Sequence, residues 1–232
     1  MSNSMTRPTI ALALSCALLS VAPRVSAEAK PPKTISSKAI YVQPLGKALP
    51  DRDVKLVVVA LRSFYGLEVK LLPRMPLPTS AYYKPRRRYR AEKLLDILAP
   101  KLPADGLRIL GLTGADISTT KGRYRDWGVI GLATMDGRAC VISSFRCHKK
   151  ARSIKQARER LAKVAVHEIG HTLGLEHCPK LGCLMEDAKG KVKTSDGEYD
   201  LCPVCRKTLK TKGWSIPATP ATYPWPRPRG FR

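Results

Sequence analysis

Acidic residues, aromatic residues and histidines are scarce in this chain. Its 232 residues include 18 Asp and Glu against 42 Lys and Arg, three Phe and only four His. Beyond the first 27 residues, no segment is apolar over the roughly 20 residues that cross a bilayer, which excludes a transmembrane span in the mature chain. No specific nucleic-acid-binding motif is present. The net charge of +24 predicts either a solvated cationic surface or one that binds an anionic surface or polymer.

The first 27 residues have the pattern of a signal peptide. Arg7 precedes an apolar run over residues 10–21, and Val25-Ser26-Ala27 fits the small-x-small rule for cleavage. We therefore expect residues 1–27 to be removed and the protein to be exported, either secreted or periplasmic. A retained N-terminal anchor is the alternative. Residues 28–37 are rich in Lys, Pro and Ser and are expected to form a flexible mature N-terminus.

The pattern of apolar residues predicts one α/β (α+β) domain. Hydrophobic residues make up 44% of the chain, enough for a core. Helical periodicity predicts three helices, at 51–64, 91–99 and 153–173, and the third is expected to stop at Gly174. Apolar or alternating runs predict strands at 39–42, 67–71, 107–112, 127–133 and 139–144. The last two strands are expected to form a hairpin across Asp136-Gly137.

The most informative segment contains three of the four histidines. His167 and His171 are four residues apart, so on a helix their imidazoles project from one face and can bind one metal ion. Glu168 lies beside the first of them, where a general base can reach a zinc-activated water. Gly174 allows the backbone to turn back and bring His177 into place as a third ligand. Three protein ligands leave one coordination position open, which is typical of catalytic zinc.

This segment resembles a known family. It matches the metzincin pattern H-E-x-x-H-x-x-G-x-x-H with a downstream methionine. Cys178 follows His177 directly, then come Cys183-Leu184-Met185 and finally Cys202-Pro203-Val204-Cys205, an order that resembles the archaemetzincin family. Weaker similarity at 88–95 and 137–143 extends the resemblance to residues 38–208. The basic, Pro-rich segment 209–232 lies outside it and is expected to be a tail.

The resemblance implies a metzincin-like catalytic domain, with a twisted mixed sheet, an active-site helix and a small zinc-stapled C-terminal part at 178–205. It implies that Met185 forms the Met-turn beneath the catalytic zinc. It also implies a second, structural zinc, and therefore two Zn²⁺ ions; the four proposed ligands of the second are Cys178, Cys183, Cys202 and Cys205. Two disulfides are the alternative in an exported protein. Outside the motif, Cys140 is expected to be a buried free thiol, and nothing decides the state of Cys147.

The function implied is that of a zinc metallopeptidase acting on a peptide or protein, with Glu168 as the catalytic base. An extended substrate would lie along residues 139–144 as the edge of the sheet. Aminopeptidase-like trimming and internal cleavage both stay open. Two other classes of function stay open as well: a catalytically silent zinc-binding module, and a cationic exported protein that binds an anionic polymer.

Overall fold

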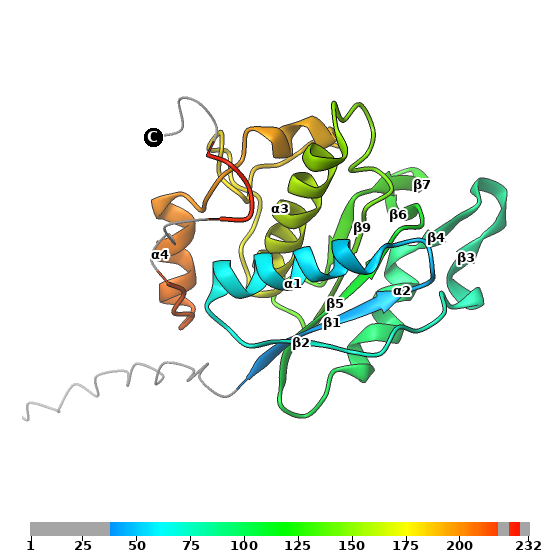
Figure 1. The fold of residues 1–232 in the computed structure, drawn as a ribbon, viewed down its shortest axis with the longest axis horizontal. Coiled ribbons are helices and arrows are strands. Elements are labelled where there is room, and N and C mark those ends of the chain that lie inside the picture. The colour runs from blue at the N-terminus through cyan, green and yellow to red at the C-terminus, as the bar shows by residue number, and fades with distance from the viewer. Residues whose placement is uncertain (1–37, 218–222, 228–232) are drawn as a thin grey trace, which may run out of the picture. The chain divides into compact units, whose positions relative to one another are not determined.

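The computed structural model describes residues 38–217 and 223–227 (Figure 1). The predicted signal peptide and mature N-terminus lie outside these residues. Five strands form the central sheet, in the order β2 (Val69–Leu71), β1 (Ala39–Leu45), β5 (Gly106–Thr113), β9 (Ala139–Ser143) and β8 (Gly131–Ala133). The first four strands are parallel, and β8 pairs with β9 in the antiparallel sense.

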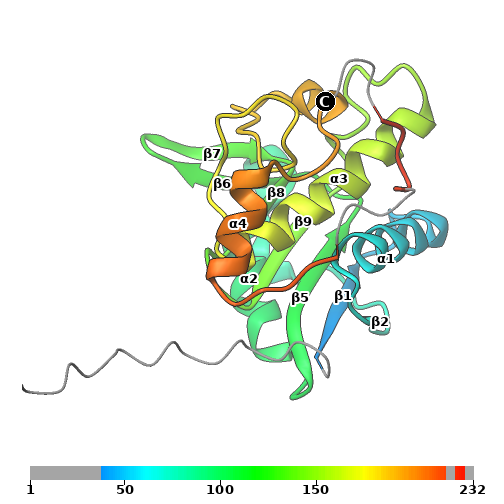
Figure 2. The same ribbon diagram turned by 90° about the vertical axis from the view of Figure 1, so that its left-hand side faces the viewer.

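Helices cover both faces of this sheet. On one face α1 (Asp51–Tyr65) packs against α3 (Ile154–Thr172), and on the other α2 (Ala91–Leu98) packs against β5 and β9 (Figure 2). Successive side chains of β1 point to opposite faces of the sheet, so they alternate between the two cores. Ile40 and Val42 belong to the core under α1 and α3, whereas Tyr41 belongs to the core under α2.

The three predicted helices and the predicted hairpin are all present. Ser153 caps α3 by accepting a hydrogen bond from the backbone N–H of Gln156, and Gly174 follows the helix with φ of +88°. Asp136 in the β8–β9 loop has φ of +48°, as a tight hairpin loop requires. Within the described residues, no helix is long and apolar enough to cross a membrane.

A second sheet was not predicted. It has the order β3 (Tyr82–Tyr83), β4 (Arg88–Arg90), β6 (Ile117–Lys121) and β7 (Tyr124–Val129). The single strand predicted at 127–133 is therefore wrong. At Ile130 the chain passes from β7, which pairs with β6, to β8, which pairs with β9. The alternation of side chains does not reveal such a change of partner, since both halves keep the same period.

The predicted edge strand was also wrong. Residues 139–144 correspond to β9, which lies between β5 and β8. Strand β8 is the last in the sheet, so the exposed backbone edge belongs to Gly131–Ala133. The short helices that complete the described chain are η1 (Thr79–Ala81), η2 (Lys84–Arg86), η3 (Ala99–Lys101), η4 (Val192–Asp196) and α4 (Pro203–Thr211).

Packing continues beyond residue 208, where the tail was expected to begin. Helix α4 runs through this boundary, and Trp214, Tyr223 and Trp225 are buried. The Tyr223 ring stacks on Phe64 of α1 at 5.5 Å, and the Trp225 indole donates a hydrogen bond to the Tyr199 carbonyl at 3.0 Å. Aromatic residues spaced among prolines thus provide core contacts that composition alone does not indicate.

Candidate metal centre and active-site cleft

The three histidines of the motif converge in the structure. His167 and His171 lie on the last turns of α3, and the turn at Gly174 brings His177 back toward them. One ring nitrogen from each histidine lies within 4.8 Å of the others. The ring centroids are 4.6 to 5.4 Å apart. This is the arrangement expected from the motif.

Backbone carbonyls determine which ring nitrogens can bind a metal. Nδ1 of His167 lies 2.6 Å from the Leu184 carbonyl oxygen, and Nδ1 of His171 lies 2.7 Å from that of Leu175. A carbonyl only accepts, so both Nδ1 atoms carry the proton and both Nε2 atoms present a lone pair. These two Nε2 atoms are 3.0 Å apart. Two facing lone pairs repel each other unless a cation lies between them, which fits a metal site.

The donor set suits zinc. Burial lowers the pKa of His167 to about 3 and lowers that of His171, so both rings are neutral ligands near pH 7. Ligands about 2.1 Å from a tetrahedral zinc ion are about 3.4 Å from one another, close to the observed Nε2 separation. Three imidazoles with a fourth position open to a cleft match a catalytic rather than a closed site.

Glu168 lines the same cleft, which has a volume of about 500 Å³. The side chain is only 7% exposed, and burial raises the pKa of its carboxyl group to about 8. A cation held by the neighbouring histidines would lower this pKa again. Strand β8 forms the opposite wall: a Cβ added to Gly131 would lie 2.3 Å from Oε1 of Glu168. Glycine at this position therefore lets the sheet edge approach the carboxylate closely.

Met185, the expected Met-turn residue, packs against α3 at Gly170, directly before His171 in the chain. It is fully buried, and a Cβ added to Gly170 of α3 would lie 2.6 Å from its sulfur. The Met185 carbonyl accepts a hydrogen bond from the Cys178 N–H at 2.7 Å. The residue before it, Leu184, provides the carbonyl that orients His167. The loop thus contacts the histidine-bearing helix α3 through the side chain of Met185 and orients His167 through the backbone carbonyl of Leu184.

The four C-terminal cysteines form one cluster. Their sulfur atoms all lie within 4.8 Å of one another, and the separation is 3.7 Å both between Cys178 and Cys202 and between Cys183 and Cys205. No disulfide joins them. Four thiolates about 2.3 Å from a tetrahedral zinc ion are about 3.8 Å apart, so the cluster fits a closed metal site. Cys140 is a buried free thiol, as expected, and Cys147 is free too.

Two residues that the sequence analysis missed secure the end of α3. Arg108 of β5 donates through Nε to the Thr172 carbonyl at 3.1 Å, and the Trp214 indole donates to the Leu173 carbonyl at 3.0 Å. The Arg108 guanidinium also lies over the Trp214 ring, 5.2 Å from its centroid. These contacts satisfy helix-terminal carbonyls where the chain turns toward His177. A partly polar strand and an isolated tryptophan gave no signal of this role.

Binding of an anionic polymer has no support here. In the basic segment at 84–90, Arg88 and Arg90 are half-buried and face Asp126 across the second sheet, at 3.5 and 3.8 Å. Arg88 also lies 3.3 Å from Asp116. Two arginines of the densest basic segment are therefore paired with carboxylates inside the protein instead of being exposed to an outside ligand.

Comparisons with known proteins show the family of the chain. The sequence profile described as Peptidase family M54 matches residues 40–211. The archaemetzincin of Halobacterium salinarum is 33% identical over 157 residues, covering 65% of this chain and 87% of the relative. A crystal structure of archaemetzincin from Archaeoglobus fulgidus is 33% identical, with a TM-score of 0.62, and covers 73% of this chain and 98% of that one. A crystal structure of archaemetzincin from Methanopyrus kandleri is 28% identical, with a TM-score of 0.65, and covers 79% of this chain and 98% of that one.

We expect two zinc ions per chain, one in each cluster, when metal content is measured by elemental mass spectrometry. His171→Ala should leave about one ion per chain in a folded protein, because the cysteine cluster is untouched. Cys183→Ser should also lose one ion but unfold more easily, since a structural zinc contributes to folding. One ion in the wild type would contradict two zinc sites, and loss of both ions in His171→Ala would show that the cysteine cluster does not hold its ion without the histidine site.

Proposed function

The chain belongs to peptidase family M54, the archaemetzincins, and is a zinc metallopeptidase; from this premise we propose how its residues hydrolyse a peptide bond. His167, His171 and His177 would hold the catalytic zinc, and the four clustered cysteines a structural one. The observation that supports this most strongly is the pair of Nε2 atoms facing each other at 3.0 Å with both Nδ1 atoms occupied. When bound, a zinc ion supplies Lewis-acid polarisation of the scissile carbonyl and lowers the pKa of a water molecule.

Glu168 is the proposed general base. It accepts a proton from the attacking water as the new C–O bond forms at the scissile carbon. It then delivers this proton to the amine nitrogen as the C–N bond breaks, so the protons balance over one turnover. Its place supports this role, because Glu168 lines the cleft directly beside the proposed ligand His167, where its carboxylate can reach a water molecule in the open position.

The substrate is proposed to bind as an extra strand on β8. An extended peptide there would use the free backbone edge of Gly131–Ala133, the last strand of the sheet. The same strand lines the cleft together with Glu168 and the histidines, so the peptide backbone would pass the reacting groups. Aminopeptidase-like trimming would additionally require recognition of a free N-terminus. The positions of the cuts in the products distinguish such trimming from internal cleavage.

We further propose that residues 1–27 direct export. The support is the sequence pattern alone. If so, mass spectrometry of the protein recovered outside the cytoplasm should find an N-terminus at Glu28. A chain that stays in the cytoplasm with residues 1–27 attached would contradict export.

Glu168→Gln should retain zinc and the fold but lose activity by roughly 10² to 10⁴-fold, the usual contribution of a general base. The measurement is mass spectrometry of products from a diverse peptide library, with zinc content determined in parallel. Glu68→Gln is the matched control, since Glu68 is exposed and forms only a surface ion pair with Lys70. Wild-type activity in Glu168→Gln would refute the proposed base.

Gly131→Ala should reduce turnover roughly a hundredfold while changing the melting temperature little. The added methyl would displace the flexible end of Glu168 rather than backbone, so the reacting group moves and the fold stays. Gly197→Ala is the control, because its methyl would meet only the Thr194 carbonyl oxygen at 3.7 Å. Unchanged turnover in Gly131→Ala would show that Glu168 does not need this position.

A further inference from the structure

The active-site cleft extends past the histidines along α3. Val164 lies one turn before Glu168 on the same face of the helix and lines the cleft with it. Across from it, Val192, Ser195 and Glu198 come from η4 and the segment that follows. The cleft thus continues into a pocket, defined here by these four residues, with two apolar side chains and one carboxylate.

Glu198 is a buried carboxylate without a close partner. Its residue is 3% exposed, yet it lines the cleft. Within residues 38–217 and 223–227, neither a hydrogen bond nor an ion pair within 4.0 Å involves this side chain. Burial raises the pKa of Glu198 well above its usual range. A buried carboxylate in this state gains much from a cationic hydrogen-bond donor that enters the pocket.

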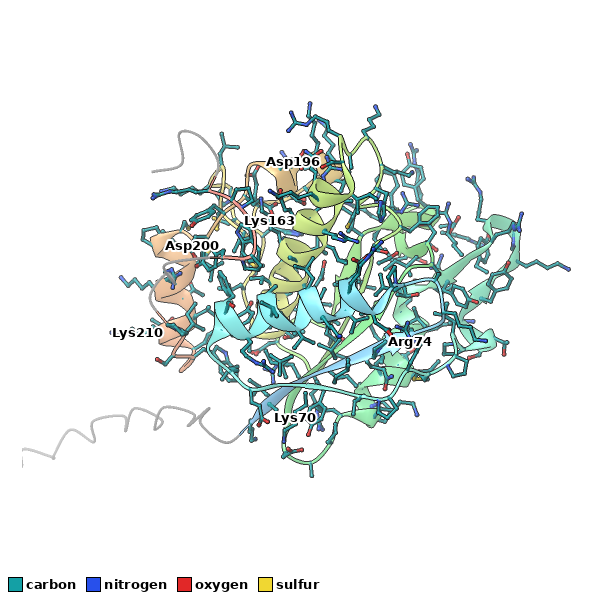
Figure 3. The ribbon with its side chains drawn as sticks, in the orientation of Figure 1. Lys70, Arg74, Lys163, Asp196, Asp200 and Lys210 are labelled. Carbon is teal, nitrogen blue, oxygen red and sulfur yellow. The ribbon has the colours of Figure 1, made fainter. Side chains whose placement is uncertain are left out.

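The nearest cations are occupied elsewhere. Lys163 lowers the pKa of Glu198 through its charge, but its ammonium donates to the Ser195 carbonyl at 2.8 Å. Arg160 pairs with both carboxylate oxygens of Asp196, at 2.7 and 2.8 Å. Figure 3 shows Lys163 on α3 beside Asp196 of η4. Both cations belong to the contact between α3 and η4. Lys163 and Glu198 act on each other's pKa through their charges, but no hydrogen bond or ion pair within 4.0 Å joins them, so the Glu198 carboxylate can still accept a hydrogen bond from a group in the cleft.

The rim of the cleft carries positive charge, which would repel a cationic side chain. Lys121, Lys149 and Lys189 line it, but all three are exposed. Arg146 also lines it and is held by Asp116 at 2.7 Å. Exposed charges are screened by water and salt, whereas a buried carboxylate acts in a low dielectric. A charged group inside the pocket therefore interacts more strongly with Glu198 than with the exposed lysines of the rim.

The backbone beside Glu198 is fixed. The Tyr199 N–H donates to the Gly182 carbonyl at 3.0 Å, and the Tyr199 carbonyl accepts from the Trp225 indole at 3.0 Å. These contacts bind the segment both to the cysteine-rich loop and to residues 223–227. A specificity pocket needs such support, because a loosely held carboxylate would select poorly.

We infer that Glu198 is a specificity-determining residue that receives the ammonium or guanidinium group of a substrate Lys or Arg next to the scissile bond. The position of this side chain next to the scissile bond rests on the proposed peptidase function. The apolar stem of either side chain would lie against Val164 and Val192, with its charged end at Glu198.

The test uses N-acetylated peptides that differ at one position, Lys against the uncharged norleucine. Cleavage by the wild type should favour Lys at one of the two positions flanking the cut by roughly tenfold or more, as a charge-assisted hydrogen bond provides. Glu198→Gln should abolish this ratio while still cleaving norleucine peptides. Glu68→Gln, the exposed control, should keep the wild-type ratio.

Binding separates this inference from the catalytic proposal. Calorimetry of the same peptides with Glu168→Gln should show the Lys preference without any turnover, and the double variant Glu168→Gln/Glu198→Gln should lack it. Absence of hydrolysis together with a Glu198-dependent binding preference would sink the catalytic proposal alone. Equal affinity for the Lys and norleucine peptides, or tighter binding of the norleucine peptide, would overturn the role of Glu198.

Discussion

The structure depends on one constraint, which is that two imidazole lone pairs face each other at 3.0 Å inside the protein. Carbonyls of Leu184 and Leu175 hold the protons on the far side of both rings, so neither ring can relieve the repulsion by changing tautomer. Only a cation between them makes the arrangement favourable. The turn at Gly174 and the loop around Met185 exist in the form observed because they place the two carbonyls and the third imidazole around that point.

The same reasoning links the two clusters. Cys178 is bonded to His177, and its N–H pairs with the Met185 carbonyl. Cys183 is bonded to Leu184, whose carbonyl orients His167. The segment that carries the cysteines contains few apolar residues, so a metal held by four thiolates would replace the core that it lacks. Two peptide bonds, between His177 and Cys178 and between Cys183 and Leu184, therefore connect the histidine site to the cysteine cluster, and disorder in the cluster would shift the proposed catalytic ligands.

Local patterns allowed the helices and the convergence of the histidines to be predicted. Periodicity extends over whole turns in α1 and α3, and the spacing of His167 and His171 is fixed by helix geometry. Two strands of the second sheet, β3 and β4, could not be predicted, because two or three residues are too few to show a period. The sheet edge at β8, the close approach at Gly131 and the burial of Trp225 depend on contacts between distant segments, on which one sequence is silent.

A net charge of +24 suggests that this protein acts on anionic partners. The net charge, however, gives every charged group the same weight, whereas in a binding site a buried charge contributes more than an exposed one. Exposed lysines at the cleft interact with a substrate through water, which weakens them several-fold relative to a buried group. Glu168 and Glu198 are the two acidic residues of the cleft that are buried. Glu168 lies beside the histidines and Glu198 lies farther along the cleft, so the two proposed roles, proton transfer and side-chain recognition, fall on separate groups. If Glu198 receives a basic side chain as proposed, the charge preferred inside the cleft is opposite to the one that the net charge of the chain suggests.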